Sequence, residues 1–209
     1  MSVLPLLAWL SPSFPIGAFA YSGGLEAAVG RGLVATGDDV AGWLDASLVG
    51  GAIRTDCLAA TLAATGGEVD ELDGLLLALS GSPTREAELV ALGHAFVEAA
   101  APWWPDGLGM PRTYPVALGT LAAARGLAAS QVPGPFALAT VTNAVQAAQR
   151  LLPIGQRDGV RIIHRLEATI AALAGAAAVA TVDDLTTSTP LAEICALAHP
   201  TVEPRLFRS

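Results

Sequence analysis

Apolar residues recur at intervals of three and four along most of the chain, and Val40, Trp43, Leu44 and Leu48 illustrate the pattern. This spacing places their side chains on one face of a helix. An acidic residue just before the stripe, either Asp38 or Asp39, is expected to cap that helix.

Further apolar stripes predict helices over 72–79, 89–97, 116–124, 141–152 and 163–173. Ser82-Pro83 suits the start of the second of these, and Gly126 suits the end of the third. Pro153 and Gly155 separate the last two, which we expect to pack as a hairpin. No segment alternates apolar and polar residues as a strand would. The pattern predicts an all-α, single-domain compact helical bundle spanning residues 1–209.

Composition narrows the possible functions. The chain is 53% hydrophobic, and its formal net charge of -8 makes a nucleic-acid partner unexpected. All 11 basic residues are arginine, which excludes a P-loop lysine and a Schiff-base lysine. If nucleotide chemistry takes place, we expect another chain to perform it.

No targeting or membrane segment is expected. The uncharged stretch 168–182 is too short to cross a bilayer comfortably. The uncharged first 25 residues lack the basic region of a signal peptide and are interrupted by prolines. Cys57 and Cys195 belong to no ligand-spaced cluster, so a reducing cytoplasm is the simplest compartment.

Ala20-Tyr21-Ser22-Gly23-Gly24 superficially resembles the nucleophile elbow of a hydrolase. An elbow follows a central strand, whereas the residues before this segment include Pro12, Pro15 and Gly17. A loop entering a helix, with Ser22 as its cap, is favoured over a serine hydrolase using Ser22.

Two other features could suggest chemistry. Cys195 and His199 lie four residues apart and would share a helix face, where they could supply two metal ligands. Two ligands do not hold a metal alone, so a buried cysteine near a helix end is favoured over a metal site. The acidic clusters 68–73 and 183–184 are expected to be exposed caps. We therefore expect no catalytic residue, no metal ligand and no cofactor.

The last residues, Arg205, Leu206, Phe207 and Arg208, combine two guanidinium groups with two large apolar side chains. Residues of this kind are enriched among interface hot spots. A docking tail, with Leu206 and Phe207 buried in a partner and the arginines paired to carboxylates, is favoured over a mobile end.

Three separated blocks carry a resemblance: SPSFPIGAFAYSGGLE at 11–26, NAVQAAQRLLPIGQRDG at 143–159 and EPRLFRS at 203–209. In this order and spacing they resemble the UreF family of urease accessory proteins. The chain departs from the family pattern at His199-Pro200 and at Gly23. The segment 69–110 resembles the family only in its helical character.

The resemblance implies an all-α, dimeric, non-enzymatic adaptor. Such a protein binds the scaffold UreD, also called UreH, and with it recruits the nickel-carrying GTPase UreG to apo-urease. A helical scaffold for another metalloenzyme is the remaining alternative.

The resemblance also implies partner-binding residues. The N-terminal docking segment (about 1–24) and the C-terminal tail (about 200–209) are expected to meet the scaffold. The candidates for the GTPase surface are Phe19, Tyr21 and Glu26, and Ser22 is a further partner-binding candidate. Arg150 and Gln156 are the candidates for the dimer or inter-helix region.

Overall fold

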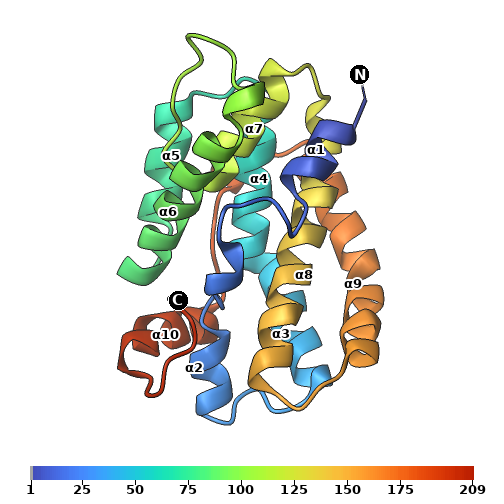
Figure 1. Ribbon diagram of the computed structural model, residues 1–209, viewed down its shortest axis with the longest axis vertical. Helices are drawn as coiled ribbons and strands as arrows, with labels where there is room; N and C mark the ends of the chain where they lie inside the picture. The colour runs from blue at the N-terminus through green and yellow to red at the C-terminus, as the bar shows by residue number, and fades with distance from the viewer. Residues whose placement is uncertain (1) are drawn as a thin grey trace.

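The computed structural model describes residues 2–209, and within them it contains ten α-helices and no strand (Figure 1). The all-α prediction is confirmed. The helices are α1 (Leu4–Trp9), α2 (Leu25–Gly30), α3 (Gly37–Gly50), α4 (Ala52–Ala64), α5 (Val69–Ala78), α6 (Pro83–Ala99), α7 (Tyr114–Ala124), α8 (Pro133–Leu151), α9 (Gln156–Ala177) and α10 (Pro190–Ala198). Short 3-10 helices lie at Ala18–Ala20, Ala101–Trp103, Ala129–Gln131, Val182–Asp184 and His199–Thr201.

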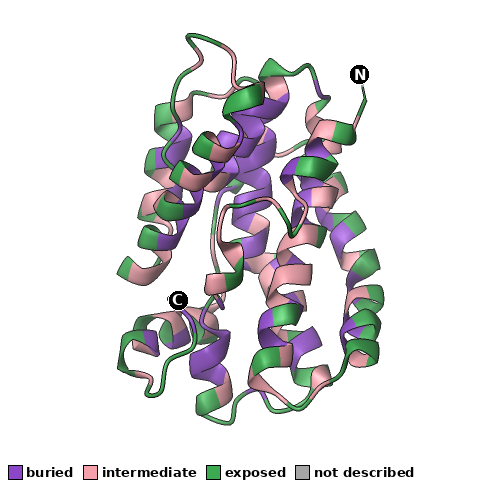
Figure 2. Cartoon of the chain, viewed as in Figure 1, coloured by how far each residue is buried: buried purple, intermediate pink, exposed green. Residues whose placement is uncertain are grey.

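Helix α4 is the centre of the bundle and packs against α3, α5, α7, α8 and α9. It was missing from the predicted helices because apolar or small residues surround it on nearly every side, and such a helix has no amphipathic stripe. Figure 2 shows α4 as a largely buried helix in the middle of the molecule. Its small residues let α7 approach closely: a Cβ added to Gly119 would lie 2.1 Å from the carbonyl oxygen of Ala60.

The predicted hairpin is present as α8 and α9, which pack along each other and against α3. Ser82 caps α6 as predicted, since its side chain accepts a hydrogen bond from Arg85 N. The predicted cap of α3 was wrong. Thr36 caps that helix, and Asp39 completes the capping box from the third helical position.

Asp73 differs from the expectation for the acidic cluster 68–73, because it is buried. Its Oδ1 accepts hydrogen bonds from Thr113 N at 2.9 Å and Thr113 Oγ1 at 2.6 Å, and its Oδ2 accepts one from Arg112 N at 2.6 Å. The carboxylate thus ties the loop before α7 to α5.

The N-terminal segment and the C-terminal end of the chain meet near α2. The segment after α1 descends across the front of the molecule to α2, and the chain end lies beside α2 and α10 (Figure 1). None of the helices in residues 2–209 is both long and apolar enough to span a membrane.

Candidate functional site

The N-terminal block enters α2 through two glycines with left-handed backbone angles, Gly23 (φ 59°) and Gly24 (φ 81°). A Cβ added to Gly24 would lie 3.1 Å from Ala196 N and 3.2 Å from the carbonyl oxygen of Ala192, both on α10. Glycine is therefore needed at position 24 for the backbone angle and for the close approach of α10.

Glu26, on the first turn of α2, holds the C-terminal tail. Its side chain is only 4% exposed. Oε1 accepts a hydrogen bond from Leu206 N at 2.6 Å, while Oε2 lies 3.2 Å from Phe207 N and 2.8 Å from His199 Nε2. Three donors thus satisfy one buried carboxylate, which is the condition for burying such a group at tolerable cost.

The tail continues along the N-terminal block by backbone pairing. Arg208 N donates to the Ala20 carbonyl oxygen at 2.7 Å, and Ser22 N donates to the Ser209 carbonyl oxygen at 2.9 Å. The Ser22 hydroxyl also donates to that Ser209 oxygen. In this arrangement the Ser22 hydroxyl bonds to the tail, and within residues 2–209 no strand precedes it as an elbow requires.

Ser22 does not occupy the predicted N-cap position of α2, which Gly24 takes. Its hydroxyl oxygen nevertheless lies 3.4 Å from Glu26 N and accepts a long hydrogen bond from it. Ser22 therefore contributes to the helix start while it binds the tail.

Phe207 anchors the tail to α8. Its side chain is 3% exposed, and the guanidinium of Arg150 lies over its ring, 4.3 Å from the centroid. Arg150 also donates to the carbonyl oxygen of Phe19 at 2.9 Å. One arginine thereby joins α8, the N-terminal block and the tail by a cation–π contact and a hydrogen bond.

We name Ser22, Glu26, Arg150, His199 and residues 206–209 the tail site. The structure thus brings together most of the predicted partner-binding residues, but it does so through contacts within the chain. Phe207 is buried in its own chain, whereas Leu206 is 58% exposed. The side chains of Arg205, Arg208 and Phe19 are exposed, Tyr21 is half-buried, and Gln156 is exposed at the first residue of α9.

Cys195 is buried near the end of α10, as favoured from the sequence. Burial raises the pKa of its thiol above the ordinary value, so the thiol stays protonated near neutral pH. His199 is also buried and faces Glu26 through Nε2.

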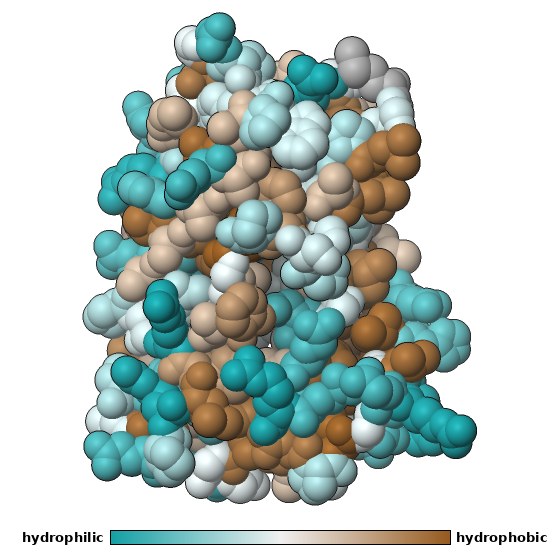
Figure 3. Space-filling model, viewed as in Figure 1, coloured by the Kyte–Doolittle hydropathy of each residue, from teal (hydrophilic) through white to brown (hydrophobic). Residues whose placement is uncertain are grey.

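An apolar surface adjoins the tail site. Leu191, Ile194 and Leu197 recur every three residues on α10 and are each more than half exposed, and we name them the α10 face. Exposed Leu206 belongs to the tail that follows α10. Figure 3 shows apolar atoms over the lower part of the molecule, where α2 and α10 lie.

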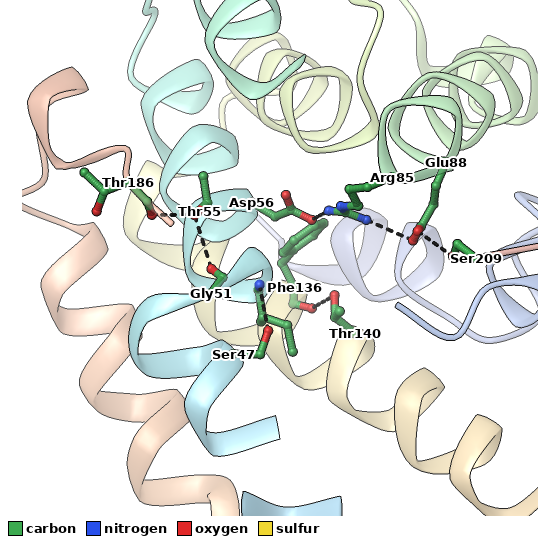
Figure 4. A network of polar contacts seen from close by, with 11 residues as sticks. Ser47, Gly51, Thr55, Asp56, Arg85, Glu88, Phe136, Thr140, Thr186 and Ser209 are labelled. Atoms are coloured by element: carbon green, nitrogen blue, oxygen red, sulfur yellow. Dashed lines mark hydrogen bonds and ion pairs between the residues drawn. The ribbon is translucent and has the colours of Figure 1, made fainter. Parts of the chain in front are cut away.

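A second feature is a buried polar network joining the tail to the core (Figure 4). Arg85 on α6 pairs with Asp56 on α4 and, at 2.9 Å, with Glu88. Ser209 Oγ donates to Glu88 at 2.9 Å. We name Asp56, Arg85, Glu88 and Ser209 the polar network.

Burial and charge pairing act in opposite directions on the pKa values of the polar network. Burial raises the pKa of Asp56 despite the opposing charge of Arg85. Burial disfavours the charged form of Arg85, but Asp56 and Glu88 outweigh it and hold the pKa of the guanidinium above its ordinary value. Burial, with a smaller effect of the Asp56 charge, raises the pKa of Tyr114, which keeps its hydroxyl neutral.

The polar network was not among the features predicted from the sequence. One usable signal was Arg85 and Glu88, which lie three residues apart and therefore share one face of α6. Another was Asp56, an acidic residue that directly precedes the apolar run at 57–60. The sequence contains no signal that would have joined the two helices.

The chain resembles known proteins over its whole length. A family model described as UreF matches residues 34–167. A protein named urease accessory protein UreF from Sinorhizobium medicae is 41% identical over 216 residues, covering 100% of this chain and 96% of the relative. The protein of the same name from Agrobacterium fabrum is 40% identical with the same coverage, and that from Jannaschia sp. is 38% identical, covering 99% of this chain and 94% of the relative.

Proposed function

This chain belongs to the UreF family of urease accessory proteins, and we propose that it acts in urease maturation as a non-catalytic adaptor. In this proposal it binds a UreD/UreH-type scaffold and recruits a UreG-type GTPase to apo-urease for nickel insertion. It works in the cytoplasm as a homodimer, and nickel is the cargo of the assembly.

The observation that carries the proposal is the α10 face, together with Leu206 on a tail held in one shape. An exposed apolar surface of this kind favours contact with another protein. Glu26, Ser22 and Arg150 order the tail before any partner arrives. A preordered segment loses less conformational entropy on binding.

The tail therefore has two parts in this proposal. Phe207 is the internal anchor, and Leu206 with the α10 face is the part that meets the scaffold. Arg205 and Arg208, whose side chains are exposed, pair with carboxylates of that partner. Phe19, exposed beside Arg150, and Tyr21 remain the proposed contacts for the GTPase.

Glu26 acts indirectly in this proposal. Its carboxylate is buried and takes part in three hydrogen bonds or polar contacts within the chain, so it shapes the tail instead of touching a partner. A charge reversal at Glu26 would release the tail from its place against α2. If GTPase recruitment is then lost, the loss reflects disorder of the tail and not a missing contact between Glu26 and the GTPase.

The test is co-purification of the chain with an affinity-tagged scaffold protein. We expect Ile194→Asp and Leu206→Asp each to weaken binding by about tenfold or more, as for hot-spot residues. Val160→Asp is the matched control, because Val160 is exposed on α9 away from the α10 face. Binding of both test variants at the wild-type level would refute the proposal, as would an equal loss in the control.

A second arm uses the GTPase. Phe19→Asp should reduce recruitment of a UreG-type GTPase to the chain–scaffold complex while leaving scaffold binding intact. Unchanged recruitment would remove Phe19 from the proposed GTPase surface.

A further inference from the structure

A groove lies between the N-terminal segment, α6 and α8, and it encloses about 620 Å³. Its rim is apolar and open to solvent, with Leu7, Phe19 and Leu138 each more than two-fifths exposed. Figure 3 shows apolar atoms over α1, where this rim begins. A volume of this size is ordinary for a ligand-binding cleft.

The walls of the groove are aromatic. Phe14, Tyr114 and Phe136 line it, and the rings of Tyr114 and Phe136 are 5.6 Å apart. Tyr114 also contacts Phe96 at 5.3 Å, so the wall continues into the packed core. Such rings present electron-rich faces, to which cations are attracted.

Asp56, Arg85 and Glu88 from the polar network also line the groove, and they line a smaller cavity of about 150 Å³ beside α10 as well. Two carboxylates therefore share one guanidinium. The three side chains are 11%, 17% and 10% exposed, respectively, so they are close to fully withdrawn from solvent.

Glu88 and Asp56 differ in how many of their carboxylate oxygens accept a hydrogen bond. Glu88 receives Arg85 on Oε1 and the Ser209 hydroxyl on Oε2. The bond of Asp56 to Arg85 uses Oδ2 and, among residues 2–209, leaves Oδ1 available to another donor. Figure 4 shows one oxygen of Asp56 turned to Arg85 and the other turned away.

We propose that this groove binds one cationic side chain, an arginine or a lysine, presented by a partner protein. The aliphatic stem lies against Phe14, Tyr114 and Phe136, and the cationic head reaches Oδ1 of Asp56. The added positive charge compensates the second carboxylate, which Arg85 alone leaves without an equal countercharge. An anion would meet two carboxylates, and a purely apolar group would leave Asp56 Oδ1 unpaired.

The groove is separate from the α10 face, and it shares only Phe19, on its rim, with the proposed GTPase surface. The inference goes beyond the proposed function because it assigns the groove a ligand of its own. Binding of a small probe to the chain alone tests it without the scaffold or the GTPase. A negative result would therefore leave the proposed function untouched.

The experiment is an NMR titration of the full chain with Nα-acetyl-arginine methylamide. The matched neutral probe is Nα-acetyl-citrulline methylamide, which keeps the shape of the side chain and lacks the charge. We expect saturable shifts at Leu138 and Ala139, and about tenfold weaker binding of the neutral probe, the loss typical of one charge-assisted hydrogen bond.

Two variants locate the site. Asp56→Asn removes the carboxylate and should weaken binding of the arginine probe about tenfold. Because this change also disturbs Arg85, Ala139→Trp provides an independent test by filling the groove without touching the polar network, with Ala172→Trp on the exposed side of α9 as its control.

The proposal is overturned if the arginine probe does not saturate, if the neutral probe binds equally well, or if shifts map outside the groove. It is also overturned if Ala139→Trp binds the arginine probe as the Ala172→Trp control does.

Discussion

At the scale of single residues, Glu26 decides the shape of the tail. We predict that Glu26→Gln destabilises the protein by about 1–3 kcal/mol, because an amide offers one acceptor oxygen where the carboxylate offers two and leaves buried donors unpaired. Chemical denaturation measures the cost, and hydrogen exchange should show loss of protection at the amides of 206–208, which donate hydrogen bonds in the folded state. Glu203→Gln, on an exposed residue of the same tail, should change neither; full protection in Glu26→Gln would contradict the prediction.

Asp39, at the start of α3, makes the stability of the protein depend on pH. Hydrogen bonds from Ala35 N and from the Thr36 side chain and backbone hold the pKa of Asp39 below its ordinary value. The folded state thus favours the charged form of Asp39. The stabilisation that Asp39 gives the folded protein is fully present above the ordinary carboxyl pKa of about 4, and it is lost as the pH falls through the lowered pKa of the folded state.

We therefore expect Asp39→Asn to lower the melting temperature at pH 7, and the difference from wild type to shrink as the pH falls below about 4. Thermal unfolding monitored by circular dichroism at a series of pH values measures this difference. Asp106→Asn, on an exposed loop, should track wild type throughout. A difference that stays constant down to pH 2 would be inconsistent with the capping role.

At the scale of elements, the close contact of α4 and α7 depends on small residues. Gly119→Ala would place a Cβ 2.1 Å from the carbonyl oxygen of Ala60 and 2.8 Å from Ala63 Cβ. We predict a loss of about 1–3 kcal/mol, because two backbones must separate. Denaturant unfolding measures it.

Gly175→Ala is the matched control for this change. Gly175 is also helical, on α9, and an added Cβ meets nothing within 4 Å there. The same substitution should therefore stabilise the protein by up to about 1 kcal/mol through helix propensity. Equal effects at the two glycines would show that propensity, and not packing, sets the result at Gly119.

At the scale of the whole molecule, the polar network connects the chain end to α6 and α4. We accordingly propose that residues 1–209 form one domain, and we expect tail and core to unfold together. With fluorine-labelled phenylalanine, the native NMR signals of Phe207 and Phe96 should disappear at the same temperature. An earlier loss of the Phe207 signal would show that the tail is a separate unit.

The amphipathic helices could be predicted from the sequence because their stripes are local. The positions of α5, α6, α7 and the α8–α9 hairpin follow from apolar spacing and from helix start and stop residues such as Ser82 and Gly126. The three blocks at 11–26, 143–159 and 203–209 were likewise sufficient to indicate the family. These features depend only on neighbouring residues or on their order in the chain.

Tertiary structure alone decided the rest. Helix α4 is central and has no amphipathic stripe that would reveal it in the sequence. Asp73 is buried because a loop 40 residues later supplies the donors of its hydrogen bonds. The tail composition predicted docking, but only the fold shows that Phe207 docks on Arg150 of its own chain while Leu206 stays exposed. Partners 181 residues apart, such as Glu26 and Phe207, leave no periodic trace in the sequence, since their pairing depends on how the helices between them pack.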